Sequence, residues 1–242
     1  MKMDLTGKRA IVTGAGNGIG RRIALELNAA GVDVAIVGRN MNRLQKTYDE
    51  AEGPGQIVVC QADLTKESEA VGVIAYAARE LGGIDFLINN AGMAQNNPFH
   101  EIDTEIWDQI MATNVRAPFL LCKNALPYLK ESGFGTIVNI CSVVAHKGYP
   151  YQAAYAASKH ALYGFSKVIA NELYKENVRV HVICPGGVYT EMVQQTRPDL
   201  DSSGLMIPED IADLVLYFLE HRATNGVIDE ISIHRPGKEP FA

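Results

Sequence analysis

The chain has few features of metal-binding, membrane-spanning or nucleic-acid-binding proteins. Its four cysteines are Cys60, Cys122, Cys141 and Cys184. They form no CxxC pair and mostly stand in apolar stretches, so we expect small buried hydrophobic residues without a disulfide or metal role. The N-terminus lacks the apolar region of a signal peptide, and no apolar run approaches the roughly 18 residues of a membrane span. A formal net charge of -6 disfavours the dense basic face of nucleic-acid-binding proteins.

These absences predict a cytoplasmic protein without a metal, a membrane or a nucleic-acid partner. The 242 residues are 47% hydrophobic and 21% charged, which is enough to form one sizeable core. No composition shift or linker interrupts them, so we expect one domain over residues 1–242.

Short β-branched runs alternate with longer stretches of helical periodicity. The expected strands are 10–13, 34–37, 57–60, 86–88, 136–140, 178–183 and 227–233, and the clearest helical stretches are 19–30, 106–129, 155–174 and 208–220. This alternation predicts an α/β domain of the doubly wound Rossmann type, a parallel sheet with helices on both faces. The polar segment 191–207 follows the sixth strand and is either a lid over a bound ligand or an ordinary surface loop.

A glycine-rich turn, Thr13-Gly14-Ala15-Gly16-Asn17-Gly18-Ile19-Gly20, leaves the first strand and opens a helix. Glycines let the backbone approach a pyrophosphate that lies on the amino end of that helix. The candidate cofactor residues in the turn are Gly14, Gly16, Asn17, Gly18, Ile19 and Gly20. A tight strand-to-helix turn without a ligand is the alternative.

Two tyrosine-lysine pairs with a spacing of four residues lie on one predicted helix: Tyr155 with Lys159, and Tyr163 with Lys167. Residues four apart share a helix face, so the lysine ammonium can lower the pKa of the phenol and suit it to proton transfer. Ser142 closes the fifth strand, where its hydroxyl can bind a substrate oxygen. Its surroundings lack the GxSxG elbow of a nucleophile.

The glycine turn, Asn89-Asn90-Ala91-Gly92, Ser142, the Tyr155/Lys159 pair and Pro185-Gly186 together resemble the short-chain dehydrogenase/reductase family. The motifs stand in the family's order between residues 13 and 190. The resemblance selects Tyr155/Lys159 and leaves Tyr163 to packing. It implies that Tyr155 exchanges a proton with the substrate, that Ser142 polarises a carbonyl, and that Lys159 holds the cofactor ribose. It also implies that Asn114 supports its helix and a water chain, and that the protein is a homodimer or homotetramer.

The resemblance also implies cofactor contacts after later strands. They fall on Asp63 and Leu64 beside the adenine, on Asn90, Ala91 and Gly92, and on Pro185, Gly186, Val188 and Thr190 at the nicotinamide. The second strand ends at Arg39-Asn40 without a carboxylate, so electrostatics favour the 2'-phosphate of NADP(H). Asn17 stands where many NADP-using relatives carry a basic residue, which leaves NAD(H) as the alternative. Asp63 has a second interpretation as a helix cap.

The expected substrate is a carbonyl compound or secondary alcohol of small to medium size. The tail resembles the subgroup of sepiapterin reductases and 3-hydroxy acid dehydrogenases, and a 3-oxoacyl-thioester reductase is a further alternative. A non-catalytic NADP(H)-binding regulator is the competing class, although it has no need of Ser142, Tyr155 and Lys159. We expect His146 to lie in a loop or a substrate wall.

Overall fold

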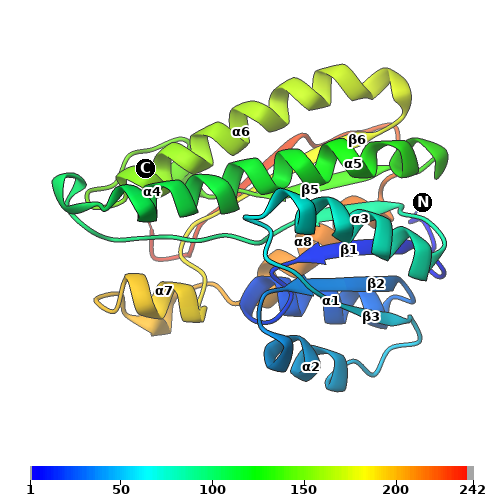
Figure 1. Cartoon of the computed structure of the whole chain (residues 1–242), viewed down its shortest axis with the longest axis horizontal. Helices are drawn as coiled ribbons and strands as arrows, with labels where there is room; N and C mark the ends of the chain where they lie inside the picture. Colours follow the sequence, from blue (N-terminus) through cyan, green and yellow to red (C-terminus); the bar gives the residue numbers. More distant parts are fainter. Residues whose placement is uncertain (1, 239–242) are drawn as a thin grey trace.

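A computed structural model describes residues 2–238. Over these residues, seven strands form one parallel sheet in the order β3-β2-β1-β4-β5-β6-β7 (Figure 1). The strands are β1 (Arg9–Thr13), β2 (Asp33–Gly38), β3 (Ile57–Gln61), β4 (Phe86–Asn89), β5 (Thr136–Ile140), β6 (Arg179–Pro185) and β7 (Glu230–Ile233). The predicted doubly wound Rossmann sheet is confirmed. Chain order reverses between β1 and β4, and in such folds ligands bind at the carboxyl ends of the strands beside that reversal.

Helices cover both faces of the sheet (Figure 1). They are α1 (Gly18–Ala29), α2 (Met41–Asp49), α3 (Glu67–Leu81), α4 (Thr104–Met111), α5 (Ala117–Glu131), α6 (Ala153–Leu173), α7 (Glu191–Thr196) and α8 (Pro208–Glu220). Short helical turns are η1 (Phe99–Glu101), η2 (Ala112–Arg116), η3 (Val143–Ala145), η4 (Tyr174–Glu176) and η5 (Ser202–Gly204). No helix among residues 2–238 is long and apolar enough to cross a membrane.

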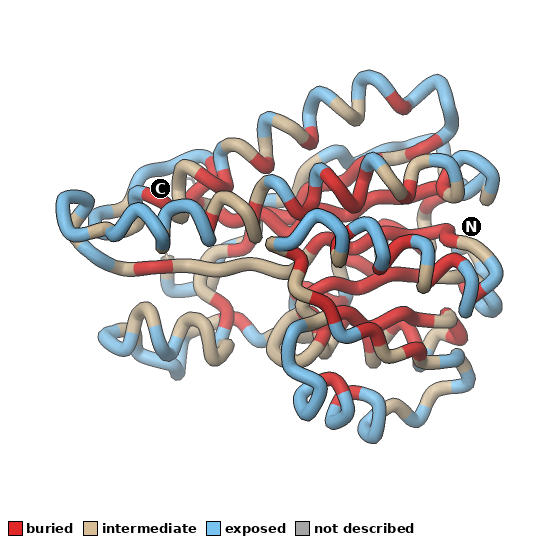
Figure 2. The backbone as a smooth tube through the Cα atoms, in the orientation of Figure 1, coloured by how far each residue is buried: buried red, intermediate tan, exposed pale blue. Residues whose placement is uncertain are grey.

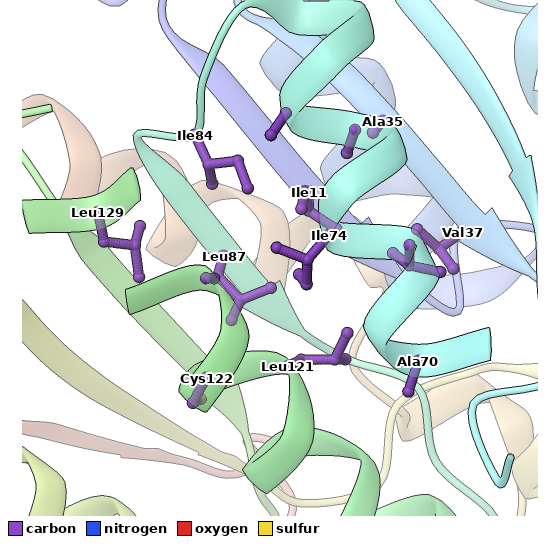
Figure 3. Packing of buried hydrophobic residues seen from close by; sticks show 14 of the residues in the cluster. Ile11, Ala35, Val37, Ala70, Ile74, Ile84, Leu87, Leu121, Cys122 and Leu129 are labelled. Carbon is purple, nitrogen blue, oxygen red and sulfur yellow. The ribbon is translucent and has the colours of Figure 1, made fainter. Parts of the chain in front are cut away.

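The sheet is buried between two apolar layers, and Figure 2 shows its strands as the most continuously buried part of the chain. Side chains alternate along each strand, so Ile11 of β1 packs with α3 and α5 while Val12 packs with α1 and α8. Ile74 and Leu121 pack against strand residues Ile11 and Leu87 on the first of these faces (Figure 3). Replacing Leu121 by alanine would cost about 2–5 kcal/mol of stability.

The predicted helix 106–129 is confirmed as an unbroken run of helical residues from Thr104 to Glu131, but this run is not α-helical throughout. The structure divides it into α4, the π-helical turn η2 and α5. Pro118 is one reason, because it has no N–H for the helical bond to the carbonyl of Asn114. The extra residue of a π turn accommodates this interruption, and such turns often mark functional sites.

The segment 191–207, predicted as a lid or a surface loop, begins with α7 and contains the turn η5. The hydroxyl of Thr190 accepts a hydrogen bond from the N–H of Val193 and so caps α7. The last strand is shorter than predicted, because only Glu230–Ile233 pairs with β6.

Candidate active site

A cleft of about 510 Å³ lies at the carboxyl ends of the strands. This volume is typical of small-molecule sites. The cleft is lined by nearly all of the predicted site residues: Gly14, Gly16, Asn17, Gly18, Ile19, Arg39, Asn40, Asp63, Leu64, Asn90, Ala91, Gly92, Ser142, Tyr155, Lys159, Pro185, Gly186, Val188 and Thr190. Two predicted residues, Gly20 and Asn114, lie behind its wall. The folded chain therefore brings seven separate segments to one opening.

The glycine turn is built for close backbone approach. Gly14 and Gly18 have φ of +67° and +52°, a region that favours glycine. A Cβ on Gly14 would stand 2.9 Å from the Cα of Ala91. A Cβ on Gly20 would overlap the carbonyl oxygen of Gly14. Gly20 is therefore required by the packing of α1 against the turn and does not face the cleft.

Asn90 fastens the loop after β4 to β1. The hydroxyl of Thr13 accepts hydrogen bonds from the N–H groups of Asn90 and Ala91, both at 3.0 Å. The side-chain amide of Asn90 donates to the carbonyl of Thr13 at 2.9 Å. These bonds hold one wall of the cleft against the glycine turn. Thr13 opens the glycine motif, but the sequence showed no reason for its role as an acceptor.

Asn114 is fully buried in η2 and does not face solvent. Its amide donates to the carbonyl of Met93 at 2.8 Å and to the hydroxyl of Ser158 at 2.9 Å, and its oxygen accepts from the N–H of Met93 at 2.8 Å. Ser158 in turn donates to the carbonyl of Tyr155 at 2.7 Å. Asn114 thus ties the β4 loop to the first turn of α6.

Ser142 and Tyr155 lie side by side in the cleft. The Ser142 hydroxyl donates to the carbonyl of Pro185 at 3.3 Å and accepts from the N–H of Val144 at 3.3 Å. Burial raises the pKa of Tyr155 to about 12, and the neighbouring Ser142 hydroxyl opposes this shift only in part. Without a bound cofactor, Tyr155 therefore keeps its proton at neutral pH.

Lys159 is buried and donates a hydrogen bond to the carbonyl of Ile140 at 2.8 Å. Its Nζ lies 5.8 Å from the ring centroid of Tyr155. The expectation that Lys159 lowers the pKa of Tyr155 is not met in this structure, because burial has the larger effect on both groups. Burial lowers the pKa of Lys159 itself.

The end of β2 presents two arginines to the cleft, Arg39 and Arg43. Arg43 was not predicted as a site residue, although it stands only four residues beyond Arg39. It lies in the first turn of α2. The side chain of Asn40 caps α2 by accepting from the N–H of Arg43 at 3.1 Å. Asp63 accepts two hydrogen bonds from Thr65, from its N–H at 3.1 Å and its hydroxyl at 2.8 Å. Asp63 therefore closes a local turn and does not cap α3.

Glu191 joins α7 to this end of the cleft. Its carboxylate accepts from the guanidinium of Arg43 at 2.8 Å and from the amide of Asn17 at 3.0 Å. The hydrogen bond from Asn17 and the contact with Arg43 lower the pKa of Glu191. The segment after β6 is thereby fastened across the glycine turn.

The second tyrosine-lysine pair lies away from the cleft. The Tyr163 hydroxyl donates to Glu230 of β7 at 2.6 Å, so this tyrosine is hydrogen-bonded as well as packed. Lys167 is exposed to solvent. His146 lies in the turn that ends η3, which is the loop alternative of its prediction, and it contacts Glu230 at 2.6 Å without lining the cleft. The four cysteines are buried and free, as predicted.

Comparison with known proteins identifies the family. The family description "short chain dehydrogenase" matches residues 8–201. The chain belongs to the short-chain dehydrogenase family. It is therefore an oxidoreductase of hydroxyl or carbonyl groups, in a family that binds a nicotinamide cofactor.

Two relatives come from Rhizobium meliloti (strain 1021). A D-beta-hydroxybutyrate dehydrogenase is 36% identical over 195 residues, 79% of this chain and 76% of that protein. An acetoacetyl-CoA reductase is 32% identical over 242 residues, 96% of this chain and 98% of that protein. The crystal structure of a metagenomic short-chain oxidoreductase in complex with NADP has a TM-score of 0.83 and 30% sequence identity. It covers 96% of this chain and 99% of that chain.

The residues of this dehydrogenase fit a nicotinamide dinucleotide. Gly14 and Gly18, both with positive φ, form the turn into α1, whose first residues Gly18 and Ile19 line the cleft. The amino end of a helix favours a pyrophosphate. Arg39 and Arg43 border the same cleft as Ser142 and Tyr155. One extended ligand can thus meet the arginines at one end and Ser142 and Tyr155 at the other.

Proposed function

We propose that this short-chain dehydrogenase is an NADP(H)-dependent carbonyl reductase or alcohol dehydrogenase, with Tyr155 as the acid/base. The substrate is a carbonyl compound or secondary alcohol of small to medium size. The observation that supports this function best is the meeting of Ser142, Tyr155 and Lys159 with the glycine turn and two arginines in one cleft. A protein that only binds the dinucleotide would have no use for a buried phenol and lysine at its other end.

When bound, the dinucleotide supplies or accepts a hydride at the substrate carbon. The hydroxyl of Ser142 has only a long bond to the carbonyl of Pro185, at 3.3 Å, so it can turn and donate to the substrate oxygen. The phenol of Tyr155 then gives its proton to that oxygen in reduction and takes it back in oxidation. Asn114 keeps this part of α6 in place through Ser158.

Tyr155 is protonated at neutral pH and so can act first as an acid, although its raised pKa makes proton donation harder until a ligand changes its surroundings. Alcohol oxidation instead needs the phenolate, so the bound state must lower this pKa towards neutrality. Lys159 is a cation able to do so, because its ammonium lies 5.8 Å from the ring centroid of Tyr155 on the same helix face. We propose that Lys159 also holds the ribose through its remaining N–H groups.

The preference for NADP(H) is proposed from Arg39 and Arg43. Arginine pairs well with phosphate, because its planar N–H groups bind two oxygens at once. A 2'-phosphate would compete with Glu191 for the guanidinium of Arg43. Glu191 stands at the start of the proposed lid, residues 191–207, so the phosphate and the lid would meet at this arginine. We also propose one domain over 1–242 and assembly as a homodimer or homotetramer.

The test measures absorbance of the reduced cofactor with NADPH and with NADH over a panel of carbonyl compounds. The panel includes acetoacetate and acetoacetyl-CoA, because two relatives are named for such chemistry. We expect turnover with at least one carbonyl compound and a lower KM for NADPH than for NADH. Equal or better use of NADH would overturn the cofactor assignment.

The control separates catalysis from cofactor binding. Tyr155→Phe should bind NADPH with nearly unchanged affinity, measured by fluorescence titration, but should lose turnover. NADPH binding without turnover of any panel member, in the wild-type protein as in the variant, would favour the non-catalytic regulator.

A further inference from the structure

Three potential metal ligands meet beside the catalytic cleft but do not line it. His146 comes from the end of η3, Cys184 from β6 and Glu230 from β7. One ligand atom from each lies within 4.8 Å of the other two. His146, Cys184 and Glu230 have no part in the proton transfer proposed above.

The sheet places two of the ligands on one face. Cys184 pairs with Ser232 in the β6–β7 register, and Val182 pairs with Glu230. Since side chains alternate along a strand, Glu230 and Ser232 project to the same side as Cys184. The turn after β5 then brings His146 over this face, where its Nε2 lies 2.6 Å from a carboxylate oxygen of Glu230. The ligands are far apart in sequence, so no motif spacing announces them.

A thiolate, an imidazole and a carboxylate form a donor set that zinc accepts. Zinc bonds of about 2.0–2.3 Å in a tetrahedron require donor atoms about 3.3–3.8 Å apart. The present spacing, up to 4.8 Å, therefore needs movements of about 1 Å, together with a small separation of His146 from Glu230. The side chains of His146 and Glu230 are 36% and 29% exposed, so both can move and an ion can enter from solvent.

Two neighbours complete the surroundings. The Tyr163 hydroxyl donates to the second oxygen of Glu230 at 2.6 Å, which orients this carboxylate as outer partners do at metal sites. Cys141 donates its thiol hydrogen to the carbonyl of Lys159 at 3.2 Å, and its sulfur neighbours that of Cys184 without being one of the three grouped ligands. Three protein ligands and an open fourth position for water remain, an arrangement known for zinc.

We propose that His146, Cys184 and Glu230 bind a divalent transition-metal ion of the zinc class. Binding releases the thiol proton of Cys184 to solvent and replaces the contact between His146 and Glu230 with two bonds to the metal. The ion would fasten the turn that follows Ser142 to β6 and β7. It would therefore stabilise the folded protein without taking part in hydride transfer.

The test titrates the reduced, chelator-treated protein with Co²⁺, whose bond to a thiolate gives a near-ultraviolet charge-transfer band. We expect one Co²⁺ per chain and displacement of the band by Zn²⁺. Cys184→Ser and His146→Ala should each abolish the band. The matched variants Cys60→Ser and His160→Ala should keep it, because these residues lie elsewhere. Tyr163→Phe should weaken binding by about 10–100-fold.

A second measurement guards against misfolding of the Cys184 variant. His146 is exposed, so His146→Ala should keep the wild-type melting temperature without metal. Zn²⁺ should raise the melting temperature of the wild-type protein and leave that of His146→Ala unchanged. A wild-type protein without the charge-transfer band, or a band that survives in both His146→Ala and Glu230→Gln, would overturn the proposal. Turnover assays on the metal-free protein test the oxidoreductase function separately.

Discussion

The two tyrosine-lysine pairs of α6 have the same spacing and different surroundings. Tyr155 and Lys159 face the cleft, where Lys159 is buried and bonded to the carbonyl of Ile140. Tyr163 is bonded to Glu230, and Lys167 is exposed to solvent. The ammonium lies 5.8 Å from the tyrosine ring centroid in the first pair and 5.2 Å in the second. The internal geometry of the pairs therefore does not explain which of them is placed for chemistry.

Both tyrosines hold their protons tightly, for different reasons. Burial raises the pKa of Tyr155 to about 12, whereas the hydrogen bond to Glu230 raises the pKa of Tyr163 to about 12. A phenol held by burial can respond when a ligand enters the cleft and changes its surroundings. A phenol held by a fixed carboxylate cannot respond in this way. The two tyrosines therefore differ in what faces them, because Tyr155 borders an open cleft and Tyr163 meets the fixed carboxylate of Glu230.

The largest expected difference is in turnover. Tyr155→Phe should lower kcat by about 10²–10⁴-fold, because the proton donor is lost. Tyr163→Phe removes the same atom from the same helix and should leave kcat nearly unchanged. Steady-state assays of the two purified variants check this. An equal loss of kcat in both variants would contradict the assignment, because it would show that removing either hydroxyl from α6 disables the protein.

Replacing the lysines should separate activity from stability. Lys159→Met should lower kcat/KM by about 100-fold. It should also raise the free energy of unfolding by about 1 kcal/mol, because a buried cation without a carboxylate partner is replaced by an apolar chain. Lys167→Met should change the unfolding free energy by less than about 0.5 kcal/mol. Urea unfolding measures both, and a Lys159→Met variant less stable than wild type would contradict the interpretation.

Two asparagines sharpen the comparison further. Asn114→Ala should lower the unfolding free energy by about 2–3 kcal/mol, since it takes the partner from the backbone N–H and carbonyl of Met93 and removes the hydrogen bond donated to Ser158. Asn171 is exposed and its side chain donates to the carbonyl of Lys167, so Asn171→Ala is the matched control. This change should alter the unfolding free energy by less than about 0.5 kcal/mol. Chemical denaturation of both variants measures these changes in unfolding free energy. Equal stabilities would show that Asn114 does not anchor the part of α6 that carries Tyr155 and Lys159.

The smallest expected effect is on titration at high pH. Glu230→Gln should lower the pKa of Tyr163 from about 12 towards its ordinary value of 10.0 and leave that of Tyr155 unchanged. Because the pKa of Tyr163 is higher in the folded than in the unfolded protein, its bond to Glu230 stabilises the fold fully below about pH 10. This stabilisation is lost as the pH rises to about 12, the folded-state pKa. NMR titration of ring-labelled tyrosine follows each residue separately. A shift of both tyrosines would show that their environments are coupled.

Local features of the fold were predictable from the sequence. Strands buried on both faces consist of continuous β-branched runs, so six of the seven expected strands overlap the observed ones closely and the seventh only in part. The glycine turn and the helix beginning at Gly18 depend on neighbouring residues alone. The turn η2 was not predictable, because it depends on more than Pro118. It also depends on Met93 and Ser158, which are distant in sequence and hydrogen-bond to Asn114.

The residues of the site that stand in local motifs were predictable, whereas contacts between distant segments were not. Ser142, Tyr155 and Lys159 stand in motifs, and the structure places all three on one cleft. The contact between Arg43 and Glu191 joins residues 148 positions apart, and no local pattern marks it. The predicted effect of Lys159 on Tyr155 was not found, because the sequence shows that the two share a helix face but not how deeply both are buried.

The sequence by itself determined the alternation of strands and helices, the phosphate turn and the four-residue spacing of both tyrosine-lysine pairs. These features depend on side-chain periodicity and backbone freedom, which act over a few neighbouring residues. Only the tertiary structure decided what each pair meets. The order of strands in the sheet places the end of β5 opposite Tyr155 and β7 opposite Tyr163, and that order arises from packing between segments distant in the chain.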